Sequence, residues 1–326
     1  MNVALIHSEA ELSSPYPEDY EGRDTDENVG YMAETLRQLG HSVTLVDMNL
    51  DCFERLRNMK VDVAFNLCDD GFHGETWMEP HVTALLDILR IPYTGSGHTT
   101  LTVCLDKAYT KQILSHHGLP TPDFYVAENE KELEHELEYP LIVKPVREDG
   151  SIGIKSESVV EDGKALEKQI EKVVKTYRQP ALVEEFVGGR EFNVALLGNN
   201  EPQALPISEI LFEGLEGNER IVSYNAKWLE DSVQYKATPG VCPADIPGEM
   251  AGELERISKK AYRIMGVRGY GRVDLRVGDD GPQIIEVNPN PDLGADAGFW
   301  RSAKTEGMTY GELAAKIIDY ALEGKT

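Results

Sequence analysis

The first hundred residues alternate short apolar stretches with amphipathic ones, and this order limits the possible folds more than any other feature of the sequence. Strands are predicted at 3–6, 42–46 and 61–67, and helices at 29–39 and 80–89. An acidic loop at 9–26 separates the first strand from the first helix. Strands that alternate with helices form a parallel sheet with helices on both faces. We therefore expect residues 1–103 to form an N-terminal α/β domain.

The remainder of the chain changes to an α+β pattern. A central lobe at 104–187 is predicted to contain helices at 106–117, 130–138 and 164–177 and strands at 124–126, 141–146 and 181–186. A C-terminal lobe at 188–326 is predicted to contain a strand at 192–197, helices at 250–265 and 310–322, and a hairpin of 271–277 with 283–287. The stretch 212–244 is rich in Gly, Asn and Pro and is expected to be irregular.

The chain is strongly acidic, with a net charge of −25 over 326 residues. Such a charge repels nucleic acids and anionic membranes, which argues against both classes of partner. The four cysteines, Cys52, Cys68, Cys104 and Cys242, form no CxxC pair and are interpreted as reduced thiols of a cytoplasmic protein. No apolar run reaches the roughly eighteen residues of a membrane helix, and the start lacks the pattern of a signal peptide.

The predicted C-terminal hairpin carries a group of oxygen ligands. Glu286 and Asn288 are two positions apart, so they point to the same face of their strand. Asp274 on the other strand can reach that face across the hairpin, and Arg272 shares the face of Asp274. Two carboxylates and an amide oxygen suit Mg²⁺ that bridges nucleotide phosphates, and a neighbouring cation neutralises phosphate charge. The alternative interpretation is an exposed hairpin with solvated charges.

A lysine at the end of an apolar strand is the second candidate feature. Lys144 lies in the strand 141–146, which leads into a loop that contains Gly150, Ser151 and Gly153. Such a lysine can hold phosphate oxygens while the N–H groups of the loop close over them. Neither the GxxxxGK[ST] motif nor GxGxxG after the first strand is present. An ordinary strand end with a hairpin is the alternative.

The third feature is an acidic pair, Glu184 and Glu185, at the end of the strand 181–186. The strand runs into Gly188-Gly189, where a hinge between the lobes is expected. A flat base can lie against Phe186 and Val187 and hydrogen-bond to exposed backbone, and Glu191 can bind ribose hydroxyls. Glu184 as a solvated carboxylate at a sheet edge is the alternative.

Together and in this order, these segments resemble the ATP-grasp superfamily, most closely its D-alanine–D-alanine ligase branch. The resemblance implies an ATP-grasp fold preceded by a Rossmann-like (preATP-grasp) parallel-sheet domain, and a homodimer. It also implies an ATP-dependent carboxylate–amine ligase that forms an acyl phosphate and releases ADP and phosphate. The matching stretches are 91–96, 105–107, 143–145, 183–186, 190–192, 224–227, 271–274 and 286–289.

The resemblance assigns roles to individual residues. Lys107, Lys144 and Lys227 would contact phosphates, and the loop around Ser151 would cover the γ-phosphate. Glu184, with the neighbouring Glu185 and the backbone of Phe186 and Val187, would bind adenine. Glu191 would hold the ribose. Arg272 would stabilise the acyl phosphate and the tetrahedral intermediate. Two Mg²⁺ ions, replaceable by Mn²⁺, would be held by Asp274, Glu286 and Asn288.

The segment after Asn288 departs from the family. The family runs there through a Pro-Gly-Met-Thr-like turn to a serine, whereas this chain has Asp292 in place of the glycine and Ala297 near the serine position. Asp292 and Asp296 would repel a carboxylate and favour a cationic or amine-bearing acceptor. The acceptor is therefore expected to differ from D-alanine. The alternative is that Asp292 merely caps the next helix.

Other residues at the substrate end have open interpretations. Arg301 is a candidate for binding a substrate carboxylate, and Tyr224 for contacting the substrate. His73 and His81 can replace the histidine that the family has after the third strand, or they are surface residues. Three functions remain: a ligase for another amino acid or amine-bearing precursor, a D-alanine–D-alanine ligase, and a nucleotide-binding protein without catalysis.

Overall fold

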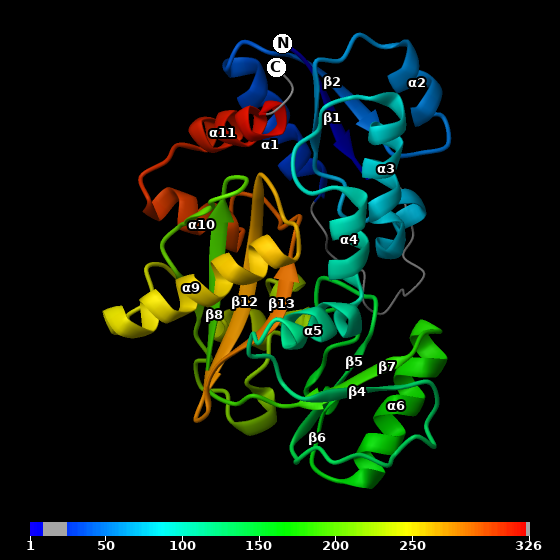
Figure 1. Ribbon diagram of the computed structural model, residues 1–326, viewed down its shortest axis with the longest axis vertical. Coiled ribbons are helices and arrows are strands. Elements are labelled where there is room, and N and C mark those ends of the chain that lie inside the picture. Colours follow the sequence, from blue (N-terminus) through cyan, green and yellow to red (C-terminus); the bar gives the residue numbers. More distant parts are fainter. Residues whose placement is uncertain (9–24, 324–326) are drawn as a thin grey trace.

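The computed structural model describes residues 1–8 and 25–323, so most of the acidic loop predicted at 9–26 lies outside the described residues. Three separate sheets follow one another along the chain, and Figure 1 shows them as the upper, lower and middle parts of the molecule. One sheet falls within each of the segments 1–103, 104–187 and 188–326. No described helix is long and apolar enough to cross a bilayer.

The N-terminal sheet is parallel, as the sequence predicts, and its strand order is β2-β1-β3. Alternate residues of its strands pack on opposite faces: Leu5 and Phe65 contact α1 and α11, whereas Ile6 packs with residues of α2 and α3. Helix α11 comes from the far end of the chain and lies beside α1 (Figure 1). The elements are β1 (Asn2–His7), α1 (Thr25–Gln38), β2 (Ser42–Asp47), α2 (Cys52–Asn58), β3 (Val63–Asn66), α3 (Glu79–Leu89) and α11 (Tyr310–Leu322).

The central lobe is an antiparallel sheet of order β4-β7-β5-β6 with α6 packed on it. Helix α6 begins where Asp162 accepts hydrogen bonds from the N–H groups of Lys164 and Ala165, and it buries Leu166 and Ile170. Helices α4 and α5 connect this lobe with the N-terminal domain. The elements are α4 (His98–Leu105), α5 (Lys107–His116), β4 (Phe124–Ala127), β5 (Leu141–Pro145), β6 (Val159–Val160), α6 (Gly163–Tyr177) and β7 (Ala181–Glu185).

The helix predicted at 130–138 is wrong, because residues 132–138 form no helix. Glutamates at every second position place like charges four residues apart, which repel each other along a helix. The Glu132 carboxylate instead accepts hydrogen bonds from the Glu128 N–H and from Asn129 Nδ2, at 2.8 and 2.6 Å. The segment then runs irregularly and packs Leu133 and Leu137 against the lobe.

The C-terminal lobe contains a six-stranded sheet of order β11-β10-β8-β12-β13, with β9 paired to β8. The region predicted as irregular contains two short helices, α7 and α8, and the eight-residue helix α10 was not predicted. The elements are β8 (Arg190–Leu197), β9 (Gln203–Ala204), β10 (Ser208–Ile210), α7 (Tyr224–Trp228), α8 (Val233–Ala237), β11 (Gly240–Val241), α9 (Gly248–Ile264), β12 (Tyr270–Gly278), β13 (Gly281–Asn288) and α10 (Gly298–Thr305). Short 3-10 turns lie at Phe72–Gly74, Thr76–Met78, Ser156–Ser158 and Gly217–Glu219.

The two faces of this sheet have different chemistry. Phe192 and Val194 of β8 pack with α9 in a buried apolar cluster. Glu191 and Asn193 alternate with them and line a large cavity on the other face. The neighbouring strands repeat the pattern, because Val273 is in the apolar cluster whereas Arg272 and Asp274 line the cavity. The polar face of the sheet is therefore the floor of the candidate site.

Candidate active site

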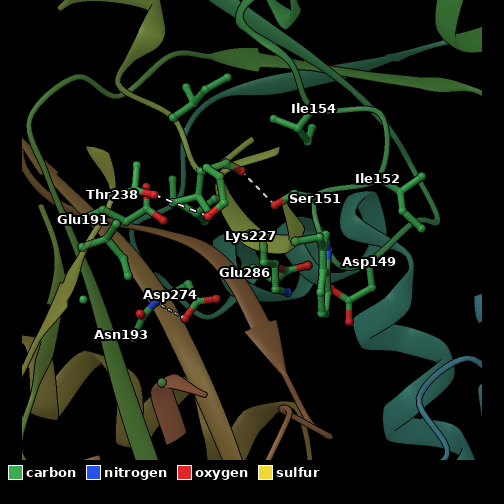
Figure 2. Close-up of a pocket in the computed structure, with 18 of the residues that line it drawn as sticks. Asp149, Ser151, Ile152, Ile154, Glu191, Asn193, Lys227, Thr238, Asp274 and Glu286 are labelled. Atoms are coloured by element: carbon green, nitrogen blue, oxygen red, sulfur yellow. Dashed lines mark hydrogen bonds between the residues drawn. The ribbon is translucent and has the colours of Figure 1, made fainter. Parts of the chain in front are cut away.

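A cavity of about 1260 Å³ lies between the central lobe and the C-terminal sheet. This exceeds the roughly 300–1,000 Å³ of ordinary small-molecule pockets, so it has room for more than one small molecule. In the view of Figure 2, Asp149 and Ser151 lie on one side and Glu191, Asn193 and Asp274 on the other. The lining side chains come from β5, β7, β8, β12 and β13 and from the segments 148–154, 221–240 and 292–301.

The hairpin forms as the sequence predicts and pairs the polar residues of its two strands. Asp274 lies opposite Glu286, and Arg272 lies opposite Asn288. Arg272 donates two hydrogen bonds to the Asp274 carboxylate, at 2.7 and 2.8 Å. Asn193, which sequence reasoning missed, donates to Asp274 Oδ1 at 2.7 Å (Figure 2). The spacing of two residues between Glu191 and Asn193 on one strand was the signal that could have revealed it.

The carboxylates of this face fit a divalent cation. Burial raises the pKa of Glu286. The nearby carboxylates of Asp149 and Asp274 raise it further, whereas Lys107 lowers it, and the net pKa is raised. Lys107 Nζ lies 3.6 Å from Glu286 Oε1. Close carboxylates at low solvent exposure are stabilised by a hard cation.

Asp274 and Glu286 would be the first ligands of such an ion. Asn288 does not line the cavity, and its Oδ1 accepts a hydrogen bond from the Asn290 N–H at 3.0 Å. Within 1–8 and 25–323, no three His, Cys, Asp or Glu side chains gather as a self-sufficient metal site. Other oxygen atoms, such as those of a bound phosphate, would therefore complete the coordination.

The loop after β5 is held over the cavity in a strained conformation. Gly150 and Ser151 both have a φ of 63°, which is unfavourable for a serine and marks functional sites. Ser151 Oγ donates to the Val222 carbonyl at 2.8 Å, and Trp228 Nε1 donates to the Gly150 carbonyl at 2.8 Å. The loop is thus fastened to the segment that carries Lys227.

Lys227 and Lys107 bring positive charge to this loop. Burial alone would raise the pKa of Asp149, but Lys227 and Lys107 outweigh it and lower that pKa. Lys107 Nζ also donates to the Glu148 carbonyl. Asp149 was not singled out from the sequence, since its role depends on lysines that are distant along the chain. Two of the three lysines predicted to contact phosphate, Lys107 and Lys227, therefore lie near this loop, whereas Lys144 is paired with Glu184. Their contact with phosphate stays a prediction.

Lys144 and Glu184 form one buried ion cluster with a third residue, Lys111. Lys144 Nζ donates to Glu184 Oε1, and Lys111 Nζ lies 2.7 Å from Glu184 Oε2. Burial acts to raise the pKa of Glu184, but the two ammonium groups lower it to about 2. Glu184 is therefore a 1 % exposed carboxylate that is charged at neutral pH, and not a solvated edge residue. Lys111 was missed, although a lysine between Ala108 and Leu114 on an apolar helix face is unusual.

The segment after β7 lines the cavity through Glu185, Phe186 and Val187. The Phe186 N–H donates to the Pro140 carbonyl at 2.9 Å, so the predicted base contact cannot use this donor. The Phe186 carbonyl and the Val187 backbone remain for it. Arg276 stacks on Phe186 with 4.9 Å between the guanidinium carbon and the ring centre, and its Nε lies 3.8 Å from Glu191 Oε2. Burial raises the pKa of Glu191 more than Arg276 lowers it.

The substrate end differs from the predictions in two respects. Tyr224 needs correction, because its side chain is 1 % exposed, packs in the core of the central lobe and does not line the cavity. The Asp292 carboxylate accepts a hydrogen bond from the Gly294 N–H at 2.7 Å, and Ala297 is the cap of α10. Asp292 therefore closes a turn and does not cap the helix. Asp292, Asp296 and Arg301 all line the cavity.

A smaller pocket adjoins the cavity on the side of the N-terminal domain. It shares Asn28, Trp228 and Asp292 with the large cavity, and His7 and Asp69 contribute to its wall. The rest of its lining is mainly apolar. His73 and His81 are exposed and line neither space, so they are surface residues.

Residues 113–319 match the family described as D-ala D-ala ligase C-terminus. The chain is 33 % identical to a D-alanine–D-alanine ligase of Bordetella avium, over 92 % of both chains. It is 32 % identical to an uncharacterised protein of Sinorhizobium fredii, over 98 % of this chain and 97 % of that protein. The crystal structure of a D-alanine–D-alanine ligase from Bacillus anthracis complexed with ATP superposes with a TM-score of 0.77 at 22 % identity, over 99 % of this chain and 97 % of that one.

Proposed function

Because the chain belongs to the D-alanine–D-alanine ligase family of ATP-dependent, ATP-grasp ligases, we propose that it joins a carboxylate donor to an amine acceptor other than D-alanine. One observation carries the proposal. The face formed by Arg272, Asp274 and Glu286 meets the loop of Asp149 and Ser151 across a single cavity. This arrangement places cationic, acidic and loop groups around one volume, as phosphoryl transfer requires.

Each residue has a role in this proposal. Glu184 lies at the base end of the nucleotide with Phe186 and Val187, and Glu191 faces the ribose. Lys144, which donates a hydrogen bond to Glu184, would contact a phosphate. Lys107, Lys227 and the Ser151 loop surround the phosphates. Asp274 and Glu286, with Asn288 behind them, would hold Mg²⁺, which supplies charge neutralisation when bound. Arg272 is oriented by Asp274 towards the reacting centre.

The reaction then proceeds in two steps. The donor carboxylate attacks the γ-phosphoryl group of ATP, and ADP leaves with formation of an acyl phosphate. The acceptor amine attacks the acyl carbon, and phosphate leaves as the amide forms. The side chains supply position and charge and take no covalent part. The loop of 148–154 would exclude water from the acyl phosphate, because its hydrogen bonds to Val222 and Trp228 hold it beside the cavity.

The acceptor assignment rests on the charged wall at the far end of the cavity. Glu230, Asp231, Asp296 and Arg301 line it there. The methyl group of alanine offers no charged or hydrogen-bonding group to these side chains, of which Arg301 is half-buried and the three carboxylates are exposed. An acceptor with a polar or charged side chain satisfies them.

Phosphate release by the purified protein with ATP and Mg²⁺ tests the proposal. Single amino acids and pairs of D- and L-amino acids serve as substrates, and D-alanine is one of them. The proposal predicts ATP-dependent release that is stronger with an acceptor other than D-alanine. Robust turnover with D-alanine alone would contradict the acceptor assignment and would favour a D-alanine–D-alanine ligase, which is what several relatives are named.

A further inference from the structure

Arg301 lines the cavity at its acceptor end and forms no ion pair with any described residue. It is held by the Ser208 hydroxyl and by the Asp296 carbonyl, which accept hydrogen bonds from Nη1 and Nη2 at 3.2 Å each. Both acceptors are neutral. In the part of the chain that the structure describes, no carboxylate lies within ion-pair distance of Arg301. The contrast is Arg272, whose charge is matched bidentately by Asp274.

The position of the Arg301 guanidinium depends on a glycine of the C-terminal sheet. The guanidinium lies against Gly240 of β11, and a Cβ at this position would be 2.7 Å from Nη2 and closer still to Nη1 and Cζ. Real Cβ atoms do not approach so closely, so only glycine lets the guanidinium occupy this place. Gly240 has no positive φ that would by itself require glycine. The glycine thus makes room for Arg301.

Arg301 takes no part in the hydrogen bonds to the Asp274 carboxylate, which come from Arg272 and Asn193. Gly298 lies next to both Asn193 and Arg301: a Cβ built on it would lie 3.8 Å from Asn193 Oδ1 and 3.9 Å from Arg301 Nη1. Asn193 in turn contacts Asp274, the partner of Arg272. In an α-amino acid the amine and the α-carboxylate share one carbon, so both stay near the acyl phosphate. Arg301 is then available for a second carboxylate, carried on the side chain of the acceptor.

We propose that Arg301 binds a carboxylate on the acceptor side chain, so that the enzyme prefers an acidic amino acid over neutral and basic ones. A guanidinium with free donors binds a carboxylate through two parallel hydrogen bonds, which is its strongest and most selective pairing. The carboxylates of Glu230, Asp231, Asp292 and Asp296 also line the cavity and act against this preference. Glu230, Asp231 and Asp296 are exposed, so solvent screens their charges, and the Asp292 carboxylate accepts a hydrogen bond within its own turn. This inference rests on the proposed function and names its acceptor class.

Binding and turnover together test it. Calorimetry with the full-length protein and a non-hydrolysable ATP analogue measures the binding of glutamate, aspartate, their side-chain amides, glutamic acid α-amide and alanine. Steady-state phosphate release measures kcat/KM for the same acceptors. The variants are R301M, which removes the positive charge, and G240A, whose added Cβ displaces the guanidinium group. G252A is the control, because a Cβ at Gly252 of α9 meets nothing within 4 Å.

The expected result is selective. R301M lowers kcat/KM for the acidic acceptors by about 100-fold, and the preference over the side-chain amides disappears. G240A lowers kcat/KM for the acidic acceptors by about tenfold. G252A leaves kcat/KM unchanged, and the KM for ATP is unchanged in the variants. Glutamic acid α-amide keeps its dependence on Arg301.

Three results overturn the inference. One is an equal loss for all acceptors in R301M, which indicates a structural role. Another is loss of the dependence on Arg301 when the α-carboxylate is amidated. The last is no preference of the wild-type protein for acidic amino acids in the calorimetry. Absence of phosphate release with every pair, together with intact and Arg301-dependent glutamate binding, would instead contradict the proposed ligase activity alone.

Discussion

The nucleotide half of the cavity and its acceptor half are built differently. In the nucleotide half, long strands carry charged groups that pair with each other, and the side chains of Arg272 and Asp274 are each 13 % exposed. In the acceptor half, the wall consists of short elements, α7, α8, β11 and α10, and the hydrogen bonds of Arg301 to described residues go to neutral groups. A half with internally matched charges serves one ligand class, whereas a half with an unmatched charge takes its counterion from the substrate.

The largest effect is expected in the nucleotide half. Asp274→Asn keeps the shape of the side chain but removes the charge that faces Arg272 and Glu286. ATP turnover should fall by about 1,000-fold or more, because charge stabilisation of the transferring phosphoryl group is lost. ADP release measures it, with circular dichroism as a check of folding. Activity within tenfold of the wild type would remove Asp274 from the site.

The Glu184 cluster should control stability in acid. The pKa of Glu184 is lowered from 4.5 to about 2, so its contribution to stability is present above pH 4.5 and is lost as the pH falls towards 2. A shift of this size corresponds to about 3 kcal/mol in the free energy of unfolding. Glu184→Gln should lose this amount at pH 7.

Denaturant unfolding between pH 7 and pH 3 measures the effect. The difference between wild type and Glu184→Gln should narrow as the pH falls below 4.5. Glu167→Gln, at an exposed position of α6, is the matched control and should change little. A difference that is constant with pH would show that the carboxylate is not held ionised by Lys111 and Lys144.

A smaller effect is expected from the residue that connects the two halves. Asn193→Ala removes the 2.7 Å hydrogen bond to Asp274 but leaves the pair of Asp274 with Arg272. We expect kcat to fall by about tenfold, since the carboxylate is less well oriented. Unchanged kinetics with both ATP and acceptor would show that Asp274 needs no support from β8.

The smallest effect is expected at Asp296. Its carbonyl, and not its carboxylate, contacts Arg301, and the side chain is exposed to solvent. Asp296→Asn should therefore change the KM for acceptors by less than about twofold. A large gain for carboxylate acceptors, or a large loss for cationic ones, would show that Asp296 sets the specificity and not Arg301.

Local patterns made much of the fold predictable. The strands β1 and β3, the helix α6 and the hairpin of β12 with β13 follow from apolar periodicity alone, and the hairpin register brings Asp274 opposite Glu286 as predicted. The helix predicted at 130–138 failed because repulsion between glutamates outweighs helix propensity there. Helices α2 and α10 are too short for their period to be recognised.

The site was predictable where its residues share an element. Arg272, Asp274 and Glu286 lie on one hairpin, so strand alternation places them together. Lys111 and Asp149 depend on contacts between distant segments, which a single sequence does not reveal. Tyr224 illustrates the converse, because its neighbour Lys227 lines the cavity while Tyr224 itself is buried in the core.

The central claim is that an intact nucleotide half serves an acceptor other than D-alanine. The most direct measurement is a competition in which the protein receives ATP, Mg²⁺ and an equimolar mixture of D- and L-amino acids, with the products identified by mass spectrometry. The account predicts an ATP-dependent dipeptide whose acceptor residue is not D-alanine and carries an acidic side chain. D-alanyl-D-alanine as the dominant product would contradict it.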